Sequence, residues 1–176
     1  MKVFTDGGCI KNGKFSARGS YGIKFEDKNF VFAHISGEIR RFNYKIINDV
    51  LTVGNLEIPP TNIRSEMLAV IIALHLIKIH KGKEVIEIIT DSEFTINVCT
   101  KWIVSWQLNN FNGKANPDLL SILFDLINYH DVHFTHVKGH SKGESENEIG
   151  NKFVDNLAKK ILSVENTDYK MIAVKN

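Results

Sequence analysis

Hydrophobic residues at the start of the chain fall in short clusters separated by glycine-rich or charged turns. Three clusters run from Lys2 to Thr5, from Tyr21 to Phe25 and from Phe30 to Ile35. Short apolar clusters bounded by turn-forming residues are typical of β-strands. The pattern therefore predicts three consecutive strands joined as a meander.

A different spacing follows from residue 63, where apolar residues return every three or four positions. Met67, Val70, Leu74 and Ile77 would lie on one face of a helix over residues 63–80. Asn62 is expected to cap this helix, because its side chain can accept a hydrogen bond from a free backbone amide. We expect the apolar face to pack on the sheet.

The remaining chain alternates between strand and helix patterns. Residues 85–90 form a β-branched run typical of a buried strand, and a helical stretch then reaches about residue 109. Residues 118–129 and 151–162 predict two further helices, with a strand at 132–137 between them. This order favours an α/β fold, a five-stranded mixed sheet flanked by helices. Residues 37–60 are too long for a simple connection and predict extra strands or a flap.

Composition changes this picture little. Of the 176 residues, 43% are hydrophobic and 24% are charged, as in ordinary soluble domains, and no linker divides the chain. Cys9 and Cys99 lie far apart without zinc-ligand spacing, so neither a disulfide framework nor structural zinc is expected. No apolar run is long enough to span a membrane. The expected location is cytoplasmic, within a reducing compartment.

Four acidic residues, Asp6, Glu66, Asp91 and Asp155, carry the candidate chemistry. Each alone has an ordinary explanation. Asp6 precedes two glycines and is typical of a turn, Glu66 suits the first turn of a helix, and Asp91 suits a cap. Asp155 would lie on a solvated helix face. Together they favour a shared site, because the first strand and the strand ending at residue 90 would be neighbours and would bring Asp6 close to Asp91. Clustered carboxylates predict a site for a hard divalent cation.

Five motifs containing these acids occur in an order that resembles type 1 ribonuclease H. The resemblance extends from Lys2 to about Lys160, and it implies a ribonuclease H-like fold with a catalytic domain over residues 1–163 and a tail over 164–176. No separate hybrid-binding domain is expected. The motifs are Asp6-Gly7-Gly8-Cys9, Thr61-Asn62-x-Arg64-x-Glu66, Thr90-Asp91-Ser92, Val137-Lys138-Gly139-His140 and Gly150-Asn151-x-x-x-Asp155-x-Leu157-Ala158.

The resemblance implies hydrolysis of the RNA strand of an RNA/DNA hybrid, with two Mg²⁺ ions or Mn²⁺ as a substitute. Two ions about 4 Å apart can activate a water and neutralise charge on the leaving oxygen. Asp6 would then bridge the metals, Asp91 and Asp155 would complete their coordination, and Glu66 would hold one metal and contact a 2′-hydroxyl. His140 would move protons or help to release product.

The same resemblance implies a set of substrate contacts. The backbone around Gly7, Gly8 and Cys9 can approach a minor groove closely, because small side chains leave room. A helical stretch with Trp102 and Trp106 resembles the family's basic protrusion, although tryptophans at this spacing are more often packing residues. The expected substrate-binding residues are Gly7, Gly8, Cys9, Asn12, Thr61, Asn62, Ser92, Glu93, Trp102 and Lys114.

The chain also departs from the family pattern. The segment between His140 and Asp155 is longer than usual and adds glutamates near the proposed metal site, and Glu93 replaces a common neutral amide. Two alternatives stay open: a nuclease of the same fold that acts on branched DNA, and a nucleic-acid-binding module without catalysis. The expected partner is an RNA/DNA hybrid, and no membrane, obligate protein partner or oligomer is expected.

Overall fold

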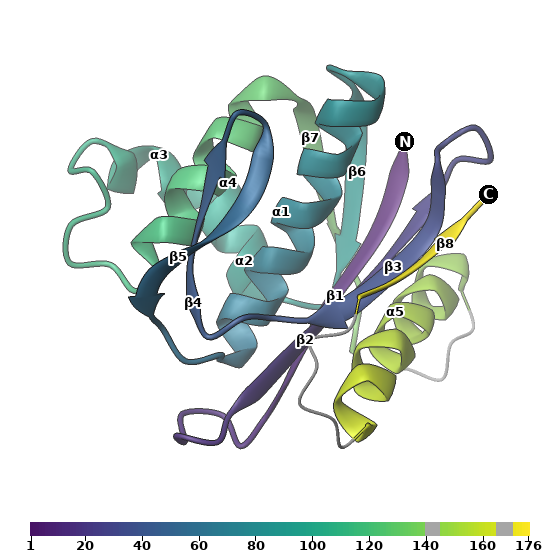
Figure 1. The fold of residues 1–176 in the computed structure, drawn as a ribbon. Coiled ribbons are helices and arrows are strands. Elements are labelled where there is room, and N and C mark those ends of the chain that lie inside the picture. Colours follow the sequence, from purple (N-terminus) through teal and green to yellow (C-terminus); the bar gives the residue numbers. More distant parts are fainter. Residues whose placement is uncertain (140–144, 165–170) are drawn as a thin grey trace.

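The fold is built on a mixed sheet of six strands, in the order β7-β6-β1-β2-β3-β8 (Figure 1). The computed structural model describes residues 1–139, 145–164 and 171–176. Strand β1 pairs in parallel with β6, which pairs in parallel with β7, while β1, β2, β3 and β8 pair antiparallel. The strands are β1 (Lys2–Ile10), β2 (Arg18–Glu26), β3 (Phe32–Glu38), β6 (Val85–Thr90), β7 (Asp131–His136) and β8 (Met171–Lys175).

Helices cover both faces of this sheet, and Figure 1 shows α1 and α5 on opposite sides of it. Helix α1 (Asn62–Lys81) packs on one face beside α4 (Pro117–Tyr129), and α5 (Glu146–Ser163) packs on the other. A helical stretch joins β6 to α4 through α2 (Glu93–Asn97), a π-helical turn (Val98–Trp102) and α3 (Ile103–Gln107). Among the residues that the structure describes, no helix is long and apolar enough to cross a membrane.

The hydrophobic core has two parts, one on each face of the sheet. The larger part lies under α1 and α4 and includes Leu74, Ile77 and Leu123. The smaller part lies under α5 and consists of Phe4, Ile89, Val137 and Val154. Strand β1 contributes alternate residues to both parts, because successive side chains of a strand point to opposite faces. Strand β1 is therefore packed against hydrophobic core on both faces of the sheet.

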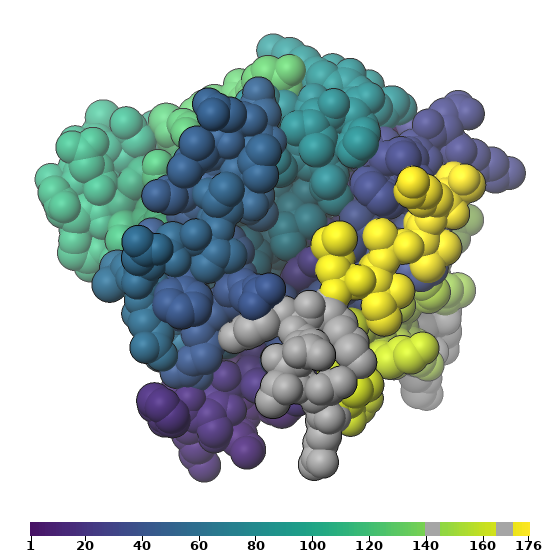
Figure 2. Space-filling view, viewed as in Figure 1, coloured from purple at the N-terminus to yellow at the C-terminus, as the bar shows by residue number. Residues whose placement is uncertain are grey.

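Residues 37–60 contain two extra strands, as one of the two sequence-based alternatives predicted. Strands β4 (Phe42–Ile47) and β5 (Val50–Glu57) form a separate two-stranded sheet. Asn48 and Asp49 both have positive φ at its tip, which is the conformation of a tight two-residue hairpin turn. Figure 2 shows this hairpin in blue on the molecular surface beside the green helical region.

A buried ion pair holds the base of the hairpin. Arg64 is 1% exposed and donates two hydrogen bonds of 2.9 Å to the carboxylate of Asp118 and one to the carbonyl of Phe42. The same carboxylate accepts a hydrogen bond from the backbone amide of Tyr44. The arginine of the second motif therefore ties α1, α4 and the hairpin together.

Several predicted boundaries differ from the structure. Strand β1 continues to Ile10, so Asp6 and the two glycines after it lie within a strand and not in a turn, since β2 pairs with this whole length. Thr61, and not Asn62, caps α1, because its side chain accepts a hydrogen bond from the amide of Arg64. Glu66 consequently lies in the second turn of α1 and not in the first.

The C-terminal part of the chain is more ordered than its sequence pattern indicated. Helix α5 begins at Glu146, because Ser145 and Glu148 form a capping box, so two of the added glutamates belong to a helix and not to a loop. Strand β8 pairs with β3 and adds a sixth strand to the five that were predicted.

Candidate functional site

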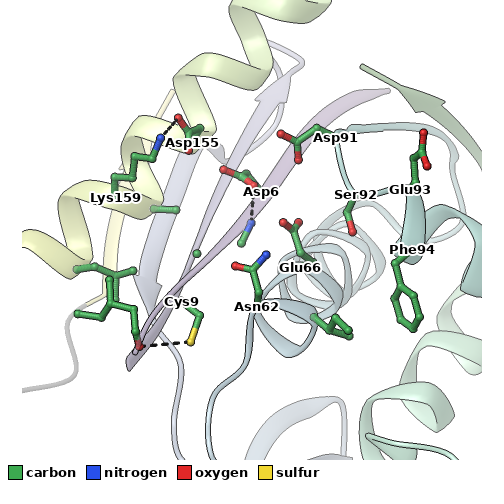
Figure 3. A pocket seen from close by; sticks show the side chains of 16 residues that line it. Asp6, Cys9, Asn62, Glu66, Asp91, Ser92, Glu93, Phe94, Asp155 and Lys159 are labelled. Atoms are coloured by element: carbon green, nitrogen blue, oxygen red, sulfur yellow. Dashed lines mark hydrogen bonds and ion pairs between the residues drawn. The ribbon is translucent and has the colours of Figure 1, made fainter. Parts of the chain in front are cut away.

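The four acidic residues are carried by four different elements that meet at one cleft (Figure 3). Asp6 lies in β1, and Asp91 follows the end of the neighbouring strand β6. Glu66 lies in α1 on one face of the sheet, and Asp155 lies in α5 on the other. Ligand sites of α/β sheets form where strands end. The expected convergence of the four acids is therefore seen in the structure.

Glycines allow the two helices to bring their acids this close. A Cβ atom added to Gly7 would overlap the backbone of Ser65 and Glu66, so the absence of a side chain lets α1 contact β1 directly. A Cβ atom added to Gly22 of β2 would overlap the backbone carbonyl of Val154 in α5. Both helix positions thus depend on glycines in the strands below them.

Three of the carboxylates form a compact group. Each of Asp6, Glu66 and Asp91 offers an oxygen atom, and these oxygens all lie within 4.8 Å of one another. Asp6 and Glu66 are each only 6% exposed, and Oε2 of Glu66 is buried without a hydrogen-bond partner among the described residues. A buried, unsatisfied carboxylate oxygen facing two other acids fits the oxygen ligands that a divalent cation prefers.

The electrostatics of this group support the same assignment. Burial, followed by repulsion from Asp91 and Asp155, raises the pKa of Asp6 to about 7. Burial, followed by repulsion from Asp6 and Asp91, also raises the pKa of Glu66 well above its usual value. Repulsion between the carboxylates would be relieved by a cation placed among them. The residues present therefore fit a divalent metal ion.

Asp155 stands apart from the three-acid group. Its carboxylate accepts a 2.6 Å hydrogen bond from Nζ of Lys159, one helical turn further along α5. Asp155 nevertheless lines the same cleft, and in Figure 3 Asp6 lies between Asp155 and Asp91. Its negative charge also contributes to the raised pKa of Asp6, so the fourth acid acts on the same cleft.

Neighbouring groups hold the carboxylates in place. The backbone amide of Gly7 donates a 2.9 Å hydrogen bond to Oδ1 of Asp6, and the side-chain amide of Asn151 donates one of 3.3 Å to Oδ2 of Asp91. A Cβ atom on Gly139 would press against Asp91, so the glycine of the fourth motif makes room for this carboxylate. Such contacts orient ligand side chains before a metal binds.

The cleft has a volume of about 570 Å³ and contains most of the predicted substrate contacts. Thr61 lies next to it as the cap of α1, and Asn12 is linked to it because Oδ1 of Asn12 accepts a 3.1 Å hydrogen bond from the amide of Asn62. The predicted contacts that line the cleft itself are Gly7, Gly8, Cys9, Asn62, Ser92 and Glu93.

Two predicted contacts lie outside this cleft. The rings of Trp102 and Trp106 stack at 5.5 Å, and Nζ of Lys114 lies 4.7 Å from the centre of the Trp106 ring. Trp106 and Lys114 line a smaller neighbouring pocket of about 80 Å³. His140 lies outside the residues that the structure describes.

The structure adds residues that the sequence analysis did not select. Lys159 and Phe94 line the main cleft. The spacing of four residues between Asp155 and Lys159 could have indicated their ion pair, because residues at this spacing are neighbours on a helix. No comparable sequence signal points to Phe94, whose position depends on how α2 packs.

The fold and the carboxylate cluster define an α/β protein with a candidate divalent-metal site on the central strands, where β6 ends beside β1. Comparison with known proteins then gives the family. The RNase H family model matches residues 1–163, and the chain belongs to this family. It is 34% identical to Ribonuclease H of Actinobacillus succinogenes over an alignment of 180 positions, which covers 97% of this chain and 96% of the relative.

Further matches agree with this assignment. Ribonuclease HI of Haemophilus influenzae is 34% identical over 165 residues, which cover 91% of this chain and 88% of the relative. Among solved structures, LC11-RNase H1 matches with a TM-score of 0.52 at 16% identity, covering 92% of this chain and 98% of that chain. At this identity the structural match supports the fold alone, while the sequence relatives support the family.

Proposed function

We propose that this protein is an endoribonuclease that hydrolyses the RNA strand of RNA/DNA hybrids, with residues 1–163 as the catalytic domain. The main support for this proposal is the group formed by Asp6, Glu66 and Asp91, whose oxygens lie within 4.8 Å of one another in the cleft. The chain's membership of the RNase H family supports the same activity. The crystal structure of LC11-RNase H1 contains an RNA/DNA hybrid, which supports the same substrate here.

In this proposal the four acids hold two divalent ions, Mg²⁺ or Mn²⁺. The ions, when bound, supply Lewis-acid activation of water and neutralise charge on the leaving 3′ oxygen. Asp6 lies between Asp91 and Asp155 and would serve both ion positions, while buried Glu66 would hold one ion and contact a 2′-hydroxyl. The protein's own contribution is a fixed set of ligands, oriented by Gly7 and Asn151 before the ions arrive.

Substrate selection depends on the residues around these acids. The 2′-hydroxyl is the group that distinguishes RNA from DNA at a nucleotide. Gly7, Gly8 and Cys9 line the cleft, and the half-buried Gly8 and Cys9 would approach the sugars of one strand closely. Asn62 and Ser92 lie on the α1 and α2 sides of the cleft, where they would contact the strands. We propose that the protein acts as a monomer, which sedimentation of the active protein would test.

Cleavage assays on four substrates would test the activity. End-labelled RNA/DNA hybrid, RNA duplex, DNA duplex and four-way DNA junction are each incubated with Mg²⁺, with Mn²⁺ and with chelator. We expect metal-dependent cutting confined to the RNA strand of the hybrid, and its loss in Asp91→Asn. Cutting of the junction alone would assign the protein to the branched-DNA nucleases. Binding of the hybrid without cutting under any condition would leave a recognition module.

His140 is proposed to assist turnover, as its motif implies. Replacing His140 with Ala should lower the turnover rate while leaving Mn²⁺ binding unchanged, because an imidazole that moves protons or aids product release need not hold the metal. An unchanged turnover rate would remove His140 from the mechanism.

A further inference from the structure

The turn between β1 and β2, residues 11–17, extends the molecule beyond the cleft. Residues 11–16 are all exposed, and the side chain of Phe15 is 89% exposed. Figure 2 shows the purple atoms of this turn at the lower rim of the molecule. An aromatic ring that faces solvent so completely contributes nothing to the core, and most of its surface is free to contact a partner.

This exposed turn is held in one conformation by the chain around it. Nη1 of Arg41, which follows β3, donates a 2.6 Å hydrogen bond to the carbonyl of Phe15 and another to the carbonyl of Ala17. The Arg41 guanidinium also lies 5.2 Å from the centre of the Phe15 ring. Two further backbone hydrogen bonds, Lys14 to Lys11 and Ala17 to Lys14, close the turn. A turn whose backbone is fixed before binding loses little conformational entropy when it binds.

The charge of the turn indicates the chemistry of a partner. No acidic residue occurs between Cys9 and Gly19, while Lys11 and Lys14 lie on either side of the turn's glycine. Lys11 and Lys14 form no ion pair with any residue in the described part of the chain. An exposed aromatic ring next to free ammonium groups fits a polyanion that also has flat faces. Single-stranded nucleic acid has both properties, because lysines bind its phosphates and aromatic rings stack on its bases.

The turn also continues directly from the candidate active site. Cys9 and Ile10 line the main cleft, and Asn12 is hydrogen-bonded to Asn62 of the same cleft. Strand β1 rises by roughly 3.3 Å per residue, so the turn begins about 13 to 17 Å from Asp6. That distance corresponds to roughly four or five nucleotides of one strand. A strand that leaves the cleft along β1 would therefore reach Phe15 within a short length.

We propose that residues 11–17 bind a single strand that continues beyond the end of a bound hybrid, with Phe15 stacking on an unpaired base and Lys11 and Lys14 contacting phosphates. This inference rests on the proposed function, since it takes the hybrid to occupy the main cleft. A paired base inside the hybrid offers no free face for stacking, so the partner is the unpaired extension and not the duplex.

Binding measurements on matched hybrids test the proposal. Fluorescence anisotropy with chelator present compares a blunt hybrid of about twelve base pairs with four versions, each carrying about six unpaired nucleotides at one end of one strand. We expect one of the four extensions to tighten binding by about five- to tenfold. Phe15→Ala should remove this gain and leave blunt-hybrid affinity unchanged, while Phe15→Trp should keep it.

Two further variants complete the experiment. Replacing both Lys11 and Lys14 with Gln should reduce the gain and weaken its dependence on salt, because fewer counterions are released. Val85→Ala is the matched control, since Val85 is an exposed apolar residue at the start of β6, beside the N-terminal end of β1 and far from the turn, and it should keep the full gain. Phe15 has so little buried surface that its replacement does not threaten folding.

The outcomes separate this inference from the proposed function. If no extension tightens binding, or if Phe15→Ala keeps the gain, the single-strand contact is wrong. A parallel cleavage assay with Mg²⁺ on the blunt hybrid then shows which claim failed. Normal cutting of the blunt hybrid would leave the proposed function intact, whereas absence of cutting by the unmodified protein would overturn that function itself.

Discussion

Gly7 of β1 lies directly against the backbone of Glu66 in α1, so closely that any side chain at position 7 would overlap it. The same glycine donates its amide hydrogen to Asp6. One residue thus orients the first carboxylate and sets the approach of the helix that carries the second. The distance between the two acids is determined by packing between a strand and a helix.

Replacing Gly7 with Ala should therefore damage the metal site more than the fold. The added methyl group must displace α1, at a cost of about 1 to 3 kcal/mol in the free energy of unfolding. The shift moves Glu66 away from Asp6, so cleavage should fall by at least about tenfold and Mn²⁺ binding should weaken. Calorimetric Mn²⁺ titration and initial cleavage rates provide the measurements.

Gly8→Ala is the control for this substitution. A Cβ atom at position 8 would meet side-chain atoms of Ser20 and Leu162 at 3.1 and 3.3 Å, and these side chains can adjust. Mn²⁺ binding should then stay close to that of the unmodified protein. Equal loss of Mn²⁺ binding in both variants would contradict the role assigned to Gly7.

The sequence predicted the acids better than the surroundings that position them. Periodicity and motif order predicted that Asp6 and Asp91 converge, because the strands that precede them were expected to be neighbours. The parallel register of β1 and β6 places the two acids level with each other. The capping role of Thr61 and the early start of α5 depend on which side chain meets a free amide, and several nearby residues had the right chemistry. Strand β8 is a short apolar run, Met171 to Val174 followed by Lys175, whose residues are all exposed. It shows no alternation of buried and solvent positions, so its pairing with β3 could not be predicted from the sequence.

The raised pKa of Asp6 predicts how stability depends on pH and metal. Asp6 has a pKa of about 7 in the folded protein and an ordinary value near 3.8 when unfolded. The folded state therefore binds more protons between these values, so this group's contribution to stability is complete below about pH 4 and is lost as the pH rises to about 7. Metal-free protein should lose stability from this source between pH 5 and 7, and Mn²⁺ should restore it at pH 8.

Thermal unfolding at several pH values, with chelator and with Mn²⁺, would measure this effect. Asp6→Asn provides the comparison, because it removes the titrating group while His75 and His130, whose pKa values are lowered by burial, remain. These histidines favour folding at higher pH and oppose the trend, so the informative quantity is the difference in Tm between the two proteins. If that difference in Tm does not vary with pH, burial and repulsion do not raise the pKa of Asp6 in the folded protein.

The ion pair between Lys159 and Asp155 predicts competition with a metal ion. The ammonium of Lys159 neutralises Asp155 in the metal-free protein, so a cation that uses this carboxylate must displace it. Lys159→Met keeps the aliphatic stem and should tighten Mn²⁺ binding by about threefold, which corresponds to roughly 0.6 kcal/mol for a partly exposed pair. Lys160→Met, one residue further along α5, should leave Mn²⁺ affinity unchanged.

A double-mutant cycle distinguishes competition from simple repulsion. In the Asp155→Asn background, Lys159→Met should no longer change Mn²⁺ affinity if the two side chains act as a pair. A gain of equal size in both backgrounds would show that Lys159 only repels the ion through space. Calorimetry without nucleic acid measures all four proteins directly.

The stacked tryptophans raise a last question, because they could be a packing feature or a platform for the substrate. Nζ of Lys114 lies over the Trp106 ring, so the ring holds a cation beside the small pocket next to the main cleft. If this cation contacts a phosphate, Lys114→Gln should weaken hybrid binding for all sequences alike and reduce the slope of log affinity against log salt by about one.

Lys101→Gln is the control, since Lys101 is exposed and lines neither pocket described here. Anisotropy of a labelled blunt hybrid over a range of salt concentrations gives both slopes, and equal slopes for Lys114→Gln and the unmodified protein would assign the tryptophans to packing.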